Sequence, residues 1–87
     1  MYSKTVTLVN PQGFHMRPAS LFVAEANKFS SAVKVVAKGN EIPGNSLMGI
    51  MAAGIKCGDE IEIIADGDDE QAAVDAIVAF VESGMGD

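Results

Sequence analysis

The sequence has few of the residues that build disulfides or metal centres. Its 87 residues include one cysteine and one histidine, and tryptophan is absent. Cys57 has no second cysteine with which to form an internal disulfide, which fits a reducing compartment. One thiol and one histidine also argue against a zinc site. We therefore expect neither a metal nor a cofactor.

Long hydrophobic runs are missing as well. No apolar run approaches the roughly 20 residues that a membrane-spanning helix needs. The first six residues, MYSKTV, lack the apolar core of a signal peptide. We therefore expect a cytoplasmic protein that does not enter a membrane. Its length and 48% hydrophobic content favour one compact domain over residues 1–87, too small for a deep cleft, so its chemistry should occur at the surface.

Basic residues are absent from the last third of the chain. All six lysines and arginines lie within residues 1–56, beside two acidic residues, whereas residues 57–87 hold ten acidic residues and no basic one. A solvated acidic face explains this asymmetry; alternatively, the mildly basic first part suits phosphate and an acidic partner surface. The missing basic stripe disfavours nucleic-acid binding.

A helix is predicted directly after the single histidine, His15. Pro18 is tolerated only in a first helical turn, where its missing N–H would have no intrahelical partner, so the helix should begin near Met16. His15 then falls at or beside the N-cap. Apolar residues recur at the spacing of one helical face: they are Ala19, Phe22, Val23, Ala26 and Phe29.

This placement makes His15 a candidate phosphate carrier. A neutral imidazole is a nucleophile near pH 7, and the helix N-terminus, with the amides of Met16 and Arg17, favours a bound anion. The Arg17 guanidinium adds a planar fork of donors that suits phosphate oxygens. A histidine before a helix is often a plain surface or capping residue, and this interpretation stays open on these residues alone.

The remaining elements follow from alternation and caps. Polar and apolar residues alternate over residues 5–8, 33–35 and 60–63, which predicts three half-buried strands. A fourth strand over residues 40–42 should follow a turn at residues 38–40, where Gly39 beside Asn40 permits positive φ. Ser46 is a plausible N-cap for a helix from residue 47 to about 53, ended by Gly54. A last helix should begin after residue 69 and stop at Gly84.

The predicted order is strand, helix, strand, strand, helix, strand, helix (βαββαβα). Alternating strands indicate a sheet with one face towards water and one covered face. We therefore expect an α+β fold, an open-faced two-layer β-sandwich with a four-stranded antiparallel sheet and three helices on one face.

Two segments, residues 13–19 (GFHMRPA) and 45–51 (NSLMGIM), at this separation resemble the HPr family of histidine-containing phosphocarriers of the bacterial phosphoenolpyruvate-dependent sugar phosphotransferase system (PTS). The likeness spans essentially the whole chain. It implies the sandwich above and a carrier rather than an enzyme. Enzyme I would hand its phosphoryl group to Nδ1 of His15, and an enzyme IIA domain would remove it. Arg17 and the amides of Met16 and Arg17 would stabilise the phosphate.

The resemblance also implies a regulatory role for Ser46, beyond a plain N-cap. In Gram-positive members the matching serine is phosphorylated by HPr kinase/phosphorylase. The added dianion would repel an acidic enzyme I surface and create a face for the catabolite-control regulator CcpA. Asn45 stands where lysine is frequent, and Pro43 and Gly44 are also departures from the family pattern.

A partner surface is predicted around the short helix. Apolar residues at helical spacing are usually core, but so short a helix cannot bury its whole circumference, and methionine suits a surface that docks unlike partners. We therefore expect the apolar residues of this helix to be partly exposed. We also expect a monomer, because the protein must leave one partner before it meets the next. The expected interface consists of Met16, Ser20, Leu21, Leu47, Met48 and Met51; at Met16 the family commonly has a small residue.

Three alternatives stay open. A regulatory paralogue resembling Crh works through the serine and has lost the histidine, so His15 with Arg17 argues against it. A nitrogen-branch carrier would act with a dedicated enzyme I. A small interaction module could use the same sandwich without phosphoryl transfer. The sequence names no sugar, because that specificity belongs to the partners.

Overall fold

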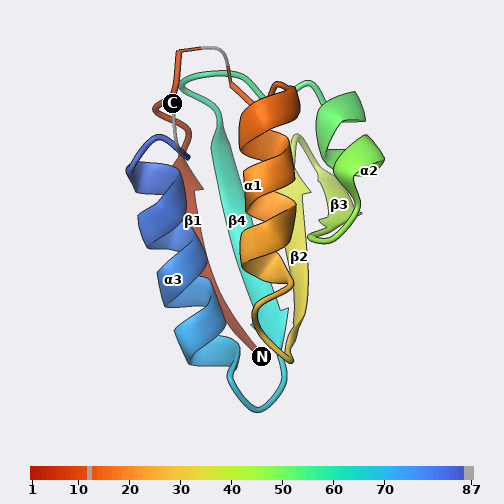
Figure 1. The fold of residues 1–87 in the computed structure, drawn as a ribbon, viewed down its shortest axis with the longest axis vertical. Helices are drawn as coiled ribbons and strands as arrows, with labels where there is room; N and C mark the ends of the chain where they lie inside the picture. The colour runs from red at the N-terminus through yellow and green to blue at the C-terminus, as the bar shows by residue number, and fades with distance from the viewer. Residues whose placement is uncertain (12, 86–87) are drawn as a thin grey trace.

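In the computed structural model, which describes residues 1–11 and 13–85, the seven elements follow the predicted order (Figure 1). They are β1 (Tyr2–Thr7), α1 (Met16–Ala26), β2 (Ala32–Ala37), β3 (Asn40–Pro43), α2 (Leu47–Ala52), β4 (Glu60–Asp66) and α3 (Glu70–Glu82). The α+β prediction is thus confirmed. Within the described residues, no helix is long and apolar enough to cross a bilayer.

The strands form one antiparallel sheet in the order β1-β4-β2-β3. Val6 of β1 pairs with Ile61 of β4, and Ile63 of β4 pairs with Val35 of β2. All four side chains are buried, while the residues between them are more exposed, so one face of the sheet forms the core. Figure 1 shows α1 and α3 running along the sheet, with α2 beside α1 and β3.

The helices cover this face with the predicted apolar stripes. Phe22 of α1 is fully buried, as are Val74, Ile77 and Val81 of α3. Phe29 differs from the prediction, because α1 ends at Ala26. Hydrogen bonds between residues three apart, such as the one from the Phe29 N–H to the Ala26 carbonyl at 3.4 Å, turn the chain there. Phe29 still packs against the core.

The turn between β2 and β3 also differs in detail from the prediction. Its two central residues are Lys38 at φ 54° and Gly39 at φ 82°, whereas Asn40 already pairs with Ala37 in the sheet. Two successive left-handed residues are the mark of a type I′ hairpin turn, whose twist matches that of the flanking strands. A lysine therefore takes a conformation that glycine and asparagine adopt more easily.

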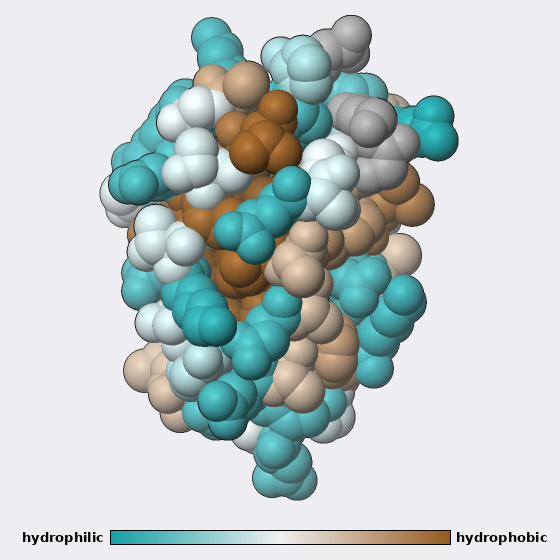
Figure 2. Space-filling view, turned by 90° about the vertical axis from the view of Figure 1, so that its left-hand side faces the viewer, coloured by the Kyte–Doolittle hydropathy of each residue, from teal (hydrophilic) through white to brown (hydrophobic). Residues whose placement is uncertain are grey.

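The acidic last third of the chain is largely on the surface. Glu60 and Glu62 alternate with buried residues of β4 and so lie on the face of the sheet opposite the helices. On α3, Asp75 pairs with Lys4 of β1 at 2.8 Å. Figure 2, seen from the α3 side, shows strongly hydrophobic surface at the centre and paler apolar surface towards the right and lower left, with hydrophilic groups spread among them. The arrangement fits a solvated acidic face.

One carboxylate joins α3 to the chain before β2. Asp69 precedes α3, and its side chain accepts hydrogen bonds from the Ser31 hydroxyl and from the N–H groups of Ser30 and Ser31, both at 2.9 Å. The Ser31 hydroxyl and the Ser30 N–H lower the pKa of the Asp69 carboxyl from its ordinary value of 3.8. The carboxylate form therefore stabilises the folded state.

Asp69→Asn is expected to lower the free energy of unfolding at pH 7, because a neutral amide is a weaker acceptor than a carboxylate. A lowered folded-state pKa gives stability that is complete above the unfolded value of 3.8 and is lost as pH falls through the folded value. The difference from wild type should therefore shrink below about pH 4. Urea unfolding at several pH values measures this difference in the free energy of unfolding, with Asp68→Asn as control. A difference that is the same at every pH contradicts the prediction.

Candidate functional site

His15 is the N-cap of α1, as the sequence predicts. Its backbone is extended, at φ −81° and ψ −177°, and its carbonyl accepts the hydrogen bond of the Ala19 N–H at 3.0 Å. The imidazole makes no capping hydrogen bond to the helix. The residue is half-buried, so the ring lies at the surface of the molecule beside the first helical turn.

The first turn of α1 supplies donors beside His15. The amides of Met16 and Arg17 precede the first intrahelical bond, which the Ala19 N–H makes, and Pro18 has no N–H. Arg17 is exposed, and Pro18 is buried beneath the turn. The turn therefore presents two backbone N–H groups, the positive end of the helix dipole and one guanidinium, a combination that suits an anion.

The histidine loop, defined here as residues 8–11 and 13–15, rests on a second loop, the platform loop of residues 54–59. The Leu8 N–H donates to the Asp59 carbonyl at 3.0 Å, and the Phe14 N–H donates to the Ile55 carbonyl at 3.1 Å. The Gly58 N–H returns a bond to the Leu8 carbonyl at 2.9 Å. These three bonds fix the backbone that leads into His15.

Gly13 makes the close approach of the two loops possible. It adopts φ +66°, and a Cβ at this position would lie 2.5 Å from the Ile55 carbonyl oxygen and 2.8 Å from Lys56 Cα. The Asn10 side-chain amide donates to the Gly13 carbonyl from a buried position. The platform loop was not predicted from the sequence, because residues about forty positions apart come together only in the fold. The two glycines, Gly13 and Gly58, were the available signal.

Ser46 caps α2, as predicted. Its Oγ accepts a hydrogen bond from the Gly49 N–H at 3.1 Å, and its carbonyl accepts one from the Ile50 N–H at 3.0 Å. The helix ends at Ala52, and Gly54 follows at φ +66° as the predicted stop. The serine is half-buried, which leaves its hydroxyl group partly accessible.

Large apolar side chains remain exposed on α1 and α2, which pack against each other. Met48 is 78% exposed, Met16 is 60% exposed and Leu21 is 38% exposed. The remaining members of the expected interface, Ser20, Leu47 and Met51, are half-buried. The sequence-predicted residues thus lie on two neighbouring helices, although their use as an interface stays a prediction.

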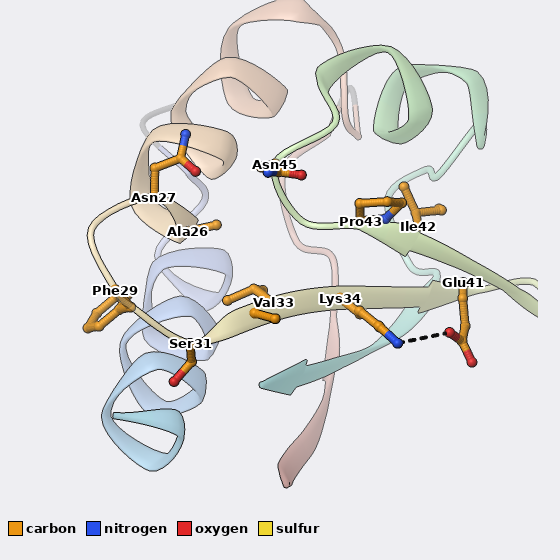
Figure 3. A pocket seen from close by; sticks show the side chains of 11 residues that line it. Ala26, Asn27, Phe29, Ser31, Val33, Lys34, Glu41, Ile42, Pro43 and Asn45 are labelled. Atoms are coloured by element: carbon orange, nitrogen blue, oxygen red, sulfur yellow. Dashed lines mark ion pairs between the residues drawn. The ribbon is translucent and has the colours of Figure 1, made fainter. Parts of the chain in front are cut away.

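A cavity of ≈ 480 Å³ lies at the opposite end of α1 from His15. Figure 3 shows it between the end of α1, the start of β2 and the segment that leads into α2. Phe29 and Val33 line its apolar part, and a pair between Lys34 and Glu41 at 3.6 Å stands near its edge. An 11-residue helix is roughly 16 Å long, so this cavity is not part of the histidine site.

A family model described as the PTS HPr component phosphorylation site matches residues 2–83. The chain belongs to the HPr family. HPr of Treponema pallidum is 42% identical over 77 residues, 88% of each chain. The HPr-like protein Crh of Halalkalibacterium halodurans is 40% identical over 82 residues, 94% of this chain and 98% of that protein. Both HPr and Crh are therefore relatives.

The fold comparison agrees. A crystal structure of HPr-C-His from Thermoanaerobacter tengcongensis matches with a TM-score of 0.95 and 40% identity, covering all of this chain and 98% of the other. HPr is a phosphocarrier protein and not an enzyme, and membership of its family implies PTS enzymes as partners. An HPr dimer from the same organism matches with a TM-score of 0.79. The family therefore includes dimers, and the monomer expected from the sequence stays a prediction.

Gly13→Ala is expected to lower the free energy of unfolding more than Gly54→Ala does. Both glycines have φ +66°, but a Cβ at Gly54 meets nothing within 4 Å. Gly54→Ala should therefore cost only the left-handed strain, about 1–2 kcal/mol, and Gly13→Ala about 1–3 kcal/mol more from the clash with the platform loop. Urea unfolding of both variants measures the difference, and equal losses contradict the close approach.

Proposed function

We propose that this HPr-family chain is the phosphocarrier of the PTS, accepting a phosphoryl group from phosphorylated enzyme I on His15 and passing it to an enzyme IIA domain. The observation that carries the proposal is the position of His15, which caps α1 directly before the amides of Met16 and Arg17. This arrangement combines a nucleophile with donors for the oxygens of the group it would receive.

The transfer follows from this geometry. Nδ1 of the neutral His15 ring forms a bond to phosphorus while the bond between phosphorus and the donor breaks, and the donor keeps that electron pair. The phosphoryl oxygens then carry the charge that the Met16 and Arg17 amides and the Arg17 guanidinium stabilise. The reverse sequence passes the group to the acceptor. Because Met16 and Arg17 are exposed, the site stays open to each partner in turn.

The regulatory part of the proposal concerns Ser46. Its half-buried hydroxyl stands at the N-terminus of α2, where added phosphate would gain the helix amides and the dipole. The same charge would lie on the helix that presents Met48, within the expected interface. HPr kinase/phosphorylase would add the group and CcpA would read it. The 40% identity to Crh adds weight to this regulatory role, while the retained His15 favours the carrier.

The carrier proposal predicts acid-labile phosphorylation of wild type by phosphoenolpyruvate and purified enzyme I, and none of His15→Ala. Arg17→Met should slow the reaction roughly 10- to 100-fold, because one charged donor is lost from the transferred group. Intact mass, followed in time, measures both effects. Lys28→Met, a change in a cation beyond the other end of α1, is the control and should react at the wild-type rate.

Two outcomes contradict the carrier proposal. Phosphorylation that persists in His15→Ala places the acceptor elsewhere. A wild-type protein that takes no phosphoryl group from several active enzyme I preparations shifts the function to Ser46 or to binding alone.

The regulatory proposal predicts that Ser46→Asp slows phosphorylation of His15, whereas Ser46→Asn does not. Aspartate and asparagine are both good N-caps, so the pair differs chiefly in charge. We expect a decrease of roughly tenfold for Ser46→Asp, through like-charge repulsion from an acidic enzyme I surface. The time course of the mass increase measures it at low and high salt; equal rates for the two variants contradict the electrostatic mechanism.

A further inference from the structure

One lysine contacts both ends of the platform loop. Lys38 Nζ donates a hydrogen bond to the Gly54 carbonyl at 2.9 Å, where the loop begins, and lies 3.6 Å from the Asp59 carboxylate, where it ends. The lysine belongs to the turn between β2 and β3, so its side chain reaches across to a loop far away in sequence. The two contacts thus connect the two ends of the platform loop through one side chain.

Both contacted residues are next to bonds that hold the histidine loop. The residue after Gly54 is Ile55, whose carbonyl accepts the Phe14 N–H at 3.1 Å, and Phe14 directly precedes His15. At the other end, the Asp59 carbonyl accepts the Leu8 N–H at 3.0 Å. Displacement of either end of the platform loop would therefore be transmitted to the backbone that carries His15.

Two hydrogen bonds within the platform loop also involve Asp59. The Asp59 carboxylate accepts the Lys56 N–H at 2.9 Å, and the Asp59 N–H donates to the Lys56 carbonyl at 3.0 Å. Lys38 and Asp59 are 51% and 35% exposed, so solvent weakens their ion pair. The hydrogen bond to the Gly54 carbonyl is exposed as well, so the lysine acts through the two contacts together, which connect the two ends of the platform loop.

The conformation of Lys38 supports a role for its side chain. The residue stands at φ 54°, where a side chain is strained and glycine would be favoured. From these contacts we infer that Lys38 is a positioning residue for His15, acting through the platform loop. The inference rests on the proposed function, since it assumes that His15 is the phosphoryl acceptor.

Lys38→Met should reduce the maximal rate of His15 phosphorylation by enzyme I about tenfold, because a small displacement of a reacting group is costly. The KM for phosphorylated enzyme I should stay unchanged, since Met16 and Met48 are not altered. Lys38→Arg keeps a charged donor and should restore most of the rate. Lys34→Met removes a lysine of β2 that also forms an ion pair, and it should match wild type.

Amide hydrogen exchange provides a second measurement. In Lys38→Met, the Phe14 and Leu8 amides should exchange about tenfold faster, because both donate to the platform loop. The Ile63 amide in the centre of the sheet should be unchanged. If Lys38→Met does not fold, Lys38→Gly replaces it, because glycine adopts the left-handed turn freely.

The outcomes separate the two claims. A wild type that is phosphorylated on His15 while Lys38→Met keeps its rate overturns the positioning role and leaves the carrier function intact. Faster exchange at Ile63 as well as at Phe14 also overturns the positioning role, because the lysine then acts on global stability. A wild type that takes no phosphoryl group overturns the carrier function itself. Local exchange, a lowered maximal rate and rescue by arginine together support the inference.

Discussion

Of the three backbone bonds between the histidine loop and the platform loop, the one from the Phe14 N–H to the Ile55 carbonyl positions the histidine site most directly, because Phe14 precedes His15. It holds the last residue before His15 against the platform loop, and the absence of a Cβ at Gly13 allows the two backbones to meet. The Phe14 ring lies edge-on to the ring of buried Phe22, with centroids 5.3 Å apart. Backbone and core together therefore fix the start of α1, which leaves the imidazole at a defined place on an exposed surface.

This contact is itself a consequence of sheet register. Thr7 and Glu60 form the last pair between β1 and β4, and the Leu8 bond to the Asp59 carbonyl continues the ladder beyond the sheet. The loops that follow β1 and precede β4 are thus neighbours because their strands are. A slip of β1 by one residue would turn Val6 out of the core, so the hydrophobic pattern that builds the sheet also places the histidine.

Local patterns in the sequence predicted the elements and caps well, because alternation, helical spacing and capping act over a few residues. The start of α1 at Met16, the cap at Ser46 and the stop at Gly54 are examples. Features that join distant segments had no such signal. The platform loop meets the histidine loop only after β1 and β4 pair, and Lys38 reaches it only after the hairpin turn forms.

The misplaced details have the same cause. Glycine beside asparagine indicated a turn at residues 38–40, but register decides which residues turn, and pairing of Ala37 with Asn40 leaves Lys38 with positive φ. Phe29 had the spacing of the α1 face, yet the chain must leave the helix to begin β2 at Ala32. In both places the pairing of the strands outweighed the local preference of the sequence.

The charge asymmetry of the chain gains a physical meaning in the fold. Glu60 and Glu62 point from the sheet face opposite to the helices, whereas His15 begins a helix on the covered face. An anion on His15 would therefore lie on the other face of the sheet from these carboxylates, while Arg17 stands two residues away in the chain. A net charge of −6 is thus compatible with an anion site, because the placement of charge rather than its sum sets the local potential.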